Sequence, residues 1–95
     1  MKINLEFLSV PIIIKIVGKK SVVFDFSGKT VNDLLHEIID TYGEKVGKYL
    51  LDDSGKLDSV FTVLLNKSDY VRQDRMNTLL RDGDQVTLMM LVAGG

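Results

Sequence analysis

The sequence predicts an α+β fold in which a mixed sheet of four to five strands is covered on one face by one main helix. Two patterns support this prediction. Residues 2–8 alternate between apolar and polar side chains, which is the period of a half-buried strand. Residues 31–42 instead repeat their apolar side chains at helical spacing, which gives that helix one apolar face. A helix of this kind is expected to cover one face of a sheet.

The remaining predicted strands are short and separated by turn residues. Pro11 interrupts the chain after the first strand, and residues 12–17 form an apolar, β-branched connection to a second strand near 21–26. Further strands are predicted at 61–65, 70–71 and 85–92. Asp82-Gly83 is a strong turn signal before the last strand.

The main helix has recognisable signals at both ends. Thr30 is a suitable N-cap residue, and Asp33 three residues later gives a weak form of the capping box. Gly43 stands where a left-handed C-terminal cap is expected. Shorter helical turns are predicted within 44–51 and 73–80.

Length and composition indicate one domain over residues 1–95, with a flexible tail at 92–95. The net charge is -1 and the 12 basic residues form no cluster, so no nucleic-acid partner is expected. No apolar run approaches the roughly 20 residues that span a bilayer, and no targeting segment is recognisable. The expectation is a cytoplasmic protein without a membrane partner. The lack of cysteine excludes disulfides, zinc thiolate sites and cysteine nucleophiles.

The sequence closes with Gly94-Gly95 after an apolar strand. Neither glycine has a Cβ, so the backbone there can pass through a narrow channel. Five extended residues reach about 17 Å, enough to present the terminal carboxylate to another protein. A carboxylate becomes a good acyl donor only after activation, usually by adenylation with ATP. Because the sequence holds no catalytic triad, nucleotide loop or metal cluster, an outside enzyme is expected to perform this step.

These features resemble the MoaD/ThiS family of sulfur carriers, which share the ubiquitin-like β-grasp fold. The residues that match at the family's spacing are Leu80, Asp82-Gly83-Asp84, Val86 and Val92-Ala93-Gly94-Gly95. Two further segments resemble the family. The start of the family's helix is similar to Gly28-Lys29-Thr30-Val31 with Asp33-Leu34-Leu35, and its middle strand is similar to Val63-Leu64-Leu65-Asn66. The resemblance covers nearly the whole chain and favours MoaD, the small subunit of molybdopterin synthase. It implies that the last strand lies centrally, beside the first.

The chain departs from the family pattern at three places. Met90-Leu91 stands where many molybdopterin-type members have a proline pair, and the stretches 10–20 and 49–60 are long for the family. These departures concern the choice of pathway more than membership of the family.

The resemblance implies a carrier or co-substrate rather than an enzyme, of the kind that forms the small subunit of a molybdopterin-synthase-like complex. An E1-like enzyme would use ATP to adenylate Gly95, and a sulfur donor would then convert the acyl-adenylate to a thiocarboxylate. The sulfur would pass to an acceptor or large-subunit enzyme, for molybdopterin synthesis in the commonest case. Gly94 would be a steric requirement, and the chain itself would bind no cofactor or metal. Some apolar residues near the tail are expected to help partners bind, although such residues fit a core equally well. They are Leu88, Met90, Leu91, Val92 and Ala93.

Three other functions stay open at this point. The same carrier chemistry fits thiazole synthesis for thiamine, and Gly95 also fits a protein modifier that forms isopeptide bonds with lysine. A β-grasp interaction module with an inert tail is the third. His36, the only histidine, is expected to be a partly exposed helical residue, because nothing predicts a nucleophile or carboxylate directed toward it.

Overall fold

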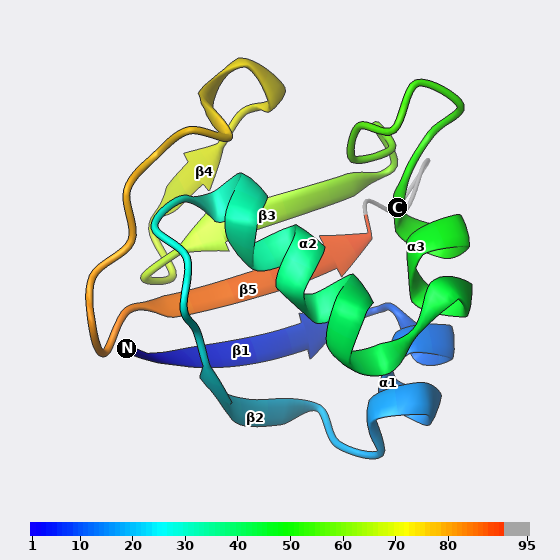
Figure 1. Ribbon diagram of the computed structural model, residues 1–95, viewed down its shortest axis with the longest axis horizontal. Helices are drawn as coiled ribbons and strands as arrows, with labels where there is room; N and C mark the ends of the chain where they lie inside the picture. Colours follow the sequence, from blue (N-terminus) through cyan, green and yellow to red (C-terminus); the bar gives the residue numbers. More distant parts are fainter. Residues whose placement is uncertain (91–95) are drawn as a thin grey trace.

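The computed structural model describes residues 1–90 of the chain. The elements in order are β1 (Lys2–Leu8), α1 (Pro11–Val17), β2 (Ser21–Asp25), α2 (Val31–Tyr42), α3 (Glu44–Leu50), β3 (Phe61–Leu65), β4 (Asp69–Val71), the 3-10 helix η1 (Gln73–Arg75) and β5 (Gln85–Met90). The predicted mixed sheet with one main helix across it is confirmed (Figure 1).

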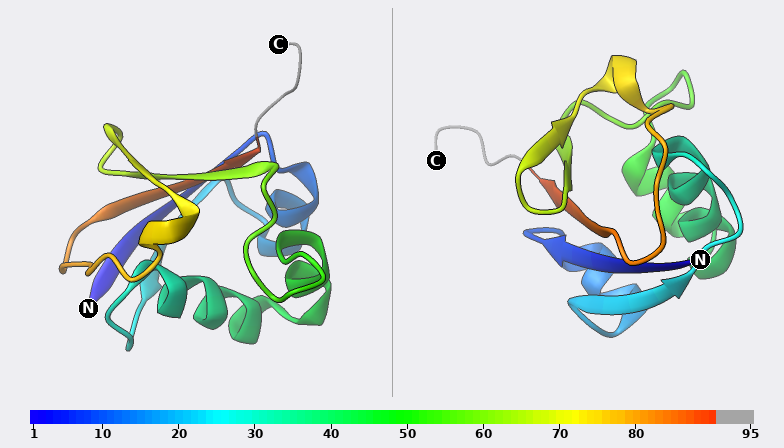
Figure 2. Two further views of the ribbon diagram at one scale, coloured as in Figure 1. Left: turned by 90° about the horizontal axis from the view of Figure 1, so that it is seen from above. Right: turned by 90° about the vertical axis from the view of Figure 1, so that its left-hand side faces the viewer.

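The five strands of the sheet follow the order β2-β1-β5-β3-β4. β1 and β5 pair in parallel at the centre, whereas the other neighbours pair antiparallel. The last strand therefore lies beside the first, as expected from the family resemblance. Figure 2 shows α2 and α3 on one side of the sheet, while its opposite face carries no helix from the described residues.

The core fills the space between the sheet and the helices. Alternate residues of β1 point into it, and α2 contributes the predicted apolar stripe. The buried residues from these two elements are Ile3, Leu5, Phe7, Val31, Leu34, Leu35 and Ile38. Complete burial of one such side chain contributes about 1.5–3 kcal/mol to folding, so these contacts hold the sheet and α2 together.

α2 begins with the capping box that the sequence predicts. The Thr30 hydroxyl accepts the backbone N–H of Asp33 at 3.1 Å, and the Asp33 carboxylate accepts the backbone N–H of Thr30 at 3.1 Å. The same carboxylate also accepts the N–H of Lys29 at 3.0 Å. The backbone hydrogen bonds from Lys29 and Thr30 lower the pKa of the Asp33 carboxyl, because they favour its charged form.

The main departure from the sequence prediction is α1. Residues 12–17, expected as a β-branched connection between strands, form a helix instead. Pro11 stands in its first turn, where a missing N–H costs little, and Gly18 ends it in a left-handed conformation with φ 87°. Burial of Ile13, whose side chain is 0% exposed, outweighs the modest preference of isoleucine and valine for strands.

The other element predictions are confirmed with two adjustments. α3 and η1 lie where short helical turns were expected. Gly43 does not form a left-handed cap, because its φ of 106° comes with ψ 173° and it also serves as the N-cap of α3. The last strand is confirmed as far as Met90, whereas residues 91–92 and the predicted tail at 92–95 lie outside the described residues.

Asn66 connects the turn after β3 to the beginning of β5. Its backbone has φ 51°, a conformation that asparagine tolerates better than most residues. Its side chain accepts the N–H of Gln85 at 2.8 Å and donates to Asp84 at 3.1 Å. Asp84 also accepts the N–H of Arg81 at 2.8 Å, and Asp82 accepts that of Lys2 at 2.6 Å. These two carboxylates therefore hold the turn that places β5 in register.

The helices of the described part of the chain are all short. None of them has both the length and the apolar character that crossing a membrane would require.

Candidate functional site

The surface around the end of β5 is the candidate site, because this strand leads toward the predicted reactive glycines. Met90 lies opposite Phe61 at the beginning of β3, and Met89 lies opposite Leu8 at the end of β1. The central strand β5 therefore ends between the end of β1 and the beginning of β3 (Figure 1). The predicted site residues beyond it, which lie outside the described residues, are Leu91, Val92, Ala93, Gly94 and Gly95.

The two predicted partner-binding residues within β5 face the helices. Leu88 is 1% exposed, and Met90 is half-buried against the core. The role predicted for Leu88 is corrected accordingly, because its side chain fills the core and offers no surface to a partner. Met90 keeps some exposure, so its predicted contact with partners stays a prediction.

Met89 points the other way, because side chains alternate along a strand. It belongs to a group on the helix-free face of the sheet. In this group Leu8 is 40% exposed and Tyr70 is 69% exposed. Leu8 of β1, Met89 of β5 and Thr62 of β3 lie side by side in one row across the sheet. Leu64 of β3 lies opposite Tyr70 of β4. We call these five residues the open-face patch.

On the same face, the residues at the beginning of β5 are polar. Thr87 is buried at 1% exposure and donates to Glu6 Oε1 at 3.1 Å. Gln85 Nε2 donates to the same oxygen at 3.4 Å. The open face therefore changes from hydrogen-bonded polar residues at the beginning of β5 to apolar residues at its end, beside the predicted tail.

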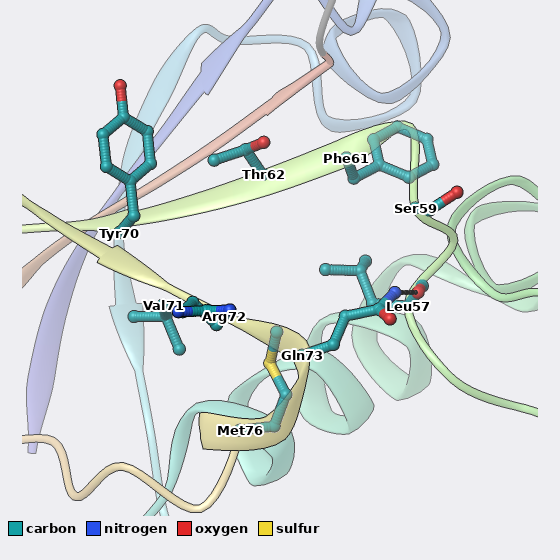
Figure 3. A pocket seen from close by; sticks show the side chains of 9 residues that line it. All are labelled: Leu57, Ser59, Phe61, Thr62, Tyr70, Val71, Arg72, Gln73 and Met76. Carbon is teal, nitrogen blue, oxygen red and sulfur yellow. Dashed lines mark hydrogen bonds between the residues drawn. The ribbon is translucent and has the colours of Figure 1, made fainter.

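A small pocket borders the open-face patch at the edge formed by β3 and β4 (Figure 3). Its volume is about 240 Å³, and Thr62 and Tyr70 of the patch help to line it. One wall is stabilised by Gln73, whose Nε2 donates to the carbonyl of Leu57 at 2.6 Å. The pocket offers a partner a recess for a side chain next to the patch.

The titratable side chains of the described residues form no metal-binding group. No group of three or more His, Asp or Glu side chains within residues 1–90 is placed to hold a metal ion. His36 is exposed on α2, as expected. The Lys2 ammonium lowers the pKa of the Asp25 carboxyl, and hydrogen bonds from Ser54 and Lys56 lower that of Asp52. Both carboxylates therefore take part in local structural contacts.

The open-face patch was not predicted from the sequence. Alternation within β5 was the available signal, because a buried Leu88 requires Met89 to face the opposite side. Leu8 and Tyr70 carried no comparable signal, since their place beside Met89 and Leu64 follows from the order of the strands.

Known proteins resemble the chain in sequence and in fold. The sequence model described as the ThiS family matches residues 12–95. Small archaeal modifier protein 3 of Haloferax volcanii is 34% identical over 82 residues, which cover 85% of this chain and 87% of that protein. The crystal structure of SAMP1 from Haloferax volcanii covers 100% of both chains with a TM-score of 0.78 at 21% identity, which confirms the β-grasp fold. A chain in the BexX/CysO complex of Amycolatopsis orientalis is 27% identical with a TM-score of 0.70, covering 98% of this chain and 99% of its own.

Proposed function

This chain belongs to the ThiS family of ubiquitin-like sulfur carriers and modifiers, and from that premise we propose that it carries sulfur on the terminal carboxylate of Gly95. The observation that carries the proposal is that the family match extends through Gly94-Gly95. In this proposal the chain is a co-substrate that binds no cofactor of its own.

The chemistry requires two partner activities. An E1-like enzyme joins the Gly95 carboxylate to the α-phosphate of ATP, which releases pyrophosphate and leaves an acyl-adenylate. A donor that supplies sulfur at the oxidation level of sulfide then attacks the acyl carbon, AMP leaves, and the product is the thiocarboxylate. Gly94 allows the narrow backbone to enter the activating site, because it has no Cβ.

The pathway that we propose is molybdopterin synthesis in the cytoplasm. There the chain would act as the small subunit of a molybdopterin-synthase-like complex and pass its sulfur to a precursor on the large subunit. The resemblance to MoaD supports this assignment, and thiazole synthesis for thiamine is the alternative destination of the same sulfur.

Protein modification is the second candidate function. Its support is the 34% identity with a protein that is itself named a small archaeal modifier. In this case a lysine amine of a target, rather than a sulfur donor, would attack the activated acyl carbon of Gly95. The adenylation step is common to both candidates, so they differ only in what attacks next.

Intact mass spectrometry of the protein purified from its own cells tests these candidates. The carrier function predicts a species in which one terminal oxygen is replaced by sulfur. Isopeptide adducts between Gly95 and lysines of other proteins, found without the sulfur species, would favour the modifier. A natural chain that continues beyond Gly95 without being trimmed would contradict both.

We assign docking of the activating enzyme to the open-face patch. The patch lies at the end of β5 that leads to the tail, and it combines exposed apolar side chains with an adjacent pocket. Apolar and aromatic residues at the centre of an interface supply most of its binding energy. A family relative that was solved in a complex, the BexX/CysO pair, supports the expectation of a protein partner.

Replacement of Leu8 by aspartate is expected to raise the KM for the carrier in the adenylation assay by about tenfold or more, with a smaller change in kcat. The reason is that a charge at this 40% exposed position must lose water when the enzyme covers it. Leu79→Asp is the matched control, because Leu79 is 69% exposed and lies outside the patch. Equal KM values for both variants and the wild type would contradict docking at this surface.

A further inference from the structure

A groove lies between α1 and α3, apart from the open-face patch. Its volume is about 710 Å³, and Ile12, Ile16 and Tyr49 give it an apolar lining. Ile12 is 46% exposed, although isoleucine is among the residues most often buried in folded proteins. The groove thus presents an apolar surface to solvent within the described part of the chain.

Positive charge surrounds this apolar lining. Lys15 from α1 and both Lys45 and Lys48 from α3 line the groove. The segments 11–20 and 44–50 together contain five lysines and one acidic residue, in a chain whose net charge is -1. The three lysines that line the groove make its local charge positive, although the chain as a whole is slightly acidic.

The single acidic residue does little to neutralise these lysines. Glu44 lies 3.9 Å from Lys48 Nζ, and their side chains are 86% and 77% exposed. Exposed pairs of this kind are weak, because water and salt screen them. The ammonium groups therefore stay available to carboxylates that approach from outside.

We propose that the groove binds an acidic amphipathic helix of a partner protein. Each of its two framing helices has seven residues and is about 10 Å long, which leaves room for about two turns of a docked helix. Two turns suffice for apolar anchors at positions i, i+3 or i+4, and i+7, the usual mode of binding in such grooves. Carboxylates beside the anchors would meet the lysines on the rim.

The shape of the surface favours a helix over an anionic membrane. Binding to a bilayer requires an apolar face that protrudes into the lipid, whereas here Ile12, Ile16 and Tyr49 line a hollow. The groove lies on the side of the molecule where β1 and β5 end, so a partner held there would also be near the activating enzyme (Figure 1). None of its residues takes part in the proposed carrier chemistry.

The proposal is tested with a synthetic helical peptide that has leucines at i, i+4 and i+7 and glutamates beside them. Titrated into the full chain, it is expected to shift the NMR signals of Ile12, Ile16 and Tyr49 in a saturable way. Reversing two rim charges, with Lys15→Glu and Lys45→Glu together, should weaken binding by about tenfold or more. Lys67→Glu is the control for charge reversal, because Lys67 is exposed in the turn between β3 and β4.

Further arms of the experiment separate the alternatives. Deletion of Gly94-Gly95 should leave peptide binding unchanged, so the result does not depend on the carrier function. The proposal would be overturned by the absence of saturable shifts at Ile12 and Ile16, or by equal binding of a peptide with lysines in place of the glutamates. Binding to phosphatidylglycerol vesicles without binding to the peptide would also overturn it, and would favour a membrane partner.

Discussion

Deletion of Gly95 is expected to reduce adenylation of the chain by at least about a hundredfold while the fold is kept. The deletion withdraws the carboxylate by about 3.5 Å, and a misplacement of about 1 Å can already cost a hundredfold in rate. ATP–pyrophosphate exchange with the E1-like partner measures the effect. Thermal unfolding should give an unchanged midpoint, because the sheet and the core are formed by residues within 1–90.

Gly94→Ala separates the two requirements on the tail. This variant keeps the carboxylate at its full reach but adds a methyl group to the backbone that must enter the activating site. We expect a smaller loss than for the deletion, seen mainly in kcat/KM. If the variant lacking Gly95 were adenylated at the wild-type rate, the assignment of the reactive residue would be wrong.

Replacement of Leu88 by alanine is expected to lower the free energy of unfolding by about 2–5 kcal/mol. Leu88 is 1% exposed on the central strand, opposite Phe7 on one side and Val63 on the other, so its loss leaves a cavity that neighbouring strands cannot easily fill. Small domains are stable by only about 5–15 kcal/mol. Urea unfolding followed by circular dichroism measures the change.

Leu79→Ala provides the matched comparison. It removes the same atoms from a side chain that is 69% exposed, and the expected change is within about 0.5 kcal/mol. Comparison of Leu88→Ala with Leu79→Ala also decides whether Leu88 acts in the core or at a binding surface. A variant at Leu88 that kept its stability but lost partner binding would show that the side chain acts at a surface, against its position in the core.

The elements that the sequence predicted best are those specified by local patterns. α2 has a full apolar stripe and a capping box at Thr30, and both signals lie within a few residues of each other. β1 shows a regular alternation, and Gly83 has the positive φ of 88° that its turn requires. In each case the local preference and the final packing agree.

α1 could not be predicted in the same way. Its residues prefer strands when judged by side-chain type, yet they form a helix because Ile13 reaches the core from that conformation. The competing signals, Pro11 at the beginning and Gly18 at the end, were present in the sequence but suit a turn equally well. Packing against distant residues decided the outcome.

The candidate site was predicted only in part, for a related reason. The glycines of the tail are a continuous motif, so they could be identified from the sequence alone. The open-face patch is assembled from four strands, and Leu8 joins its other members only through the parallel pairing with Met89. That register joins residues 81 positions apart, and a single-residue shift would turn every side chain of β5 to the other face.

The position of β5 has a consequence for how the protein is made. In the sheet, β2 pairs with β1 and β3 pairs with β4, and β5, the last strand to be synthesised, is the only link between these two pairs. A nascent chain that stops before residue 85 therefore has no continuous sheet and no complete surface on which an enzyme can dock. Translation itself thereby restricts partner recognition to chains that have been made through β5.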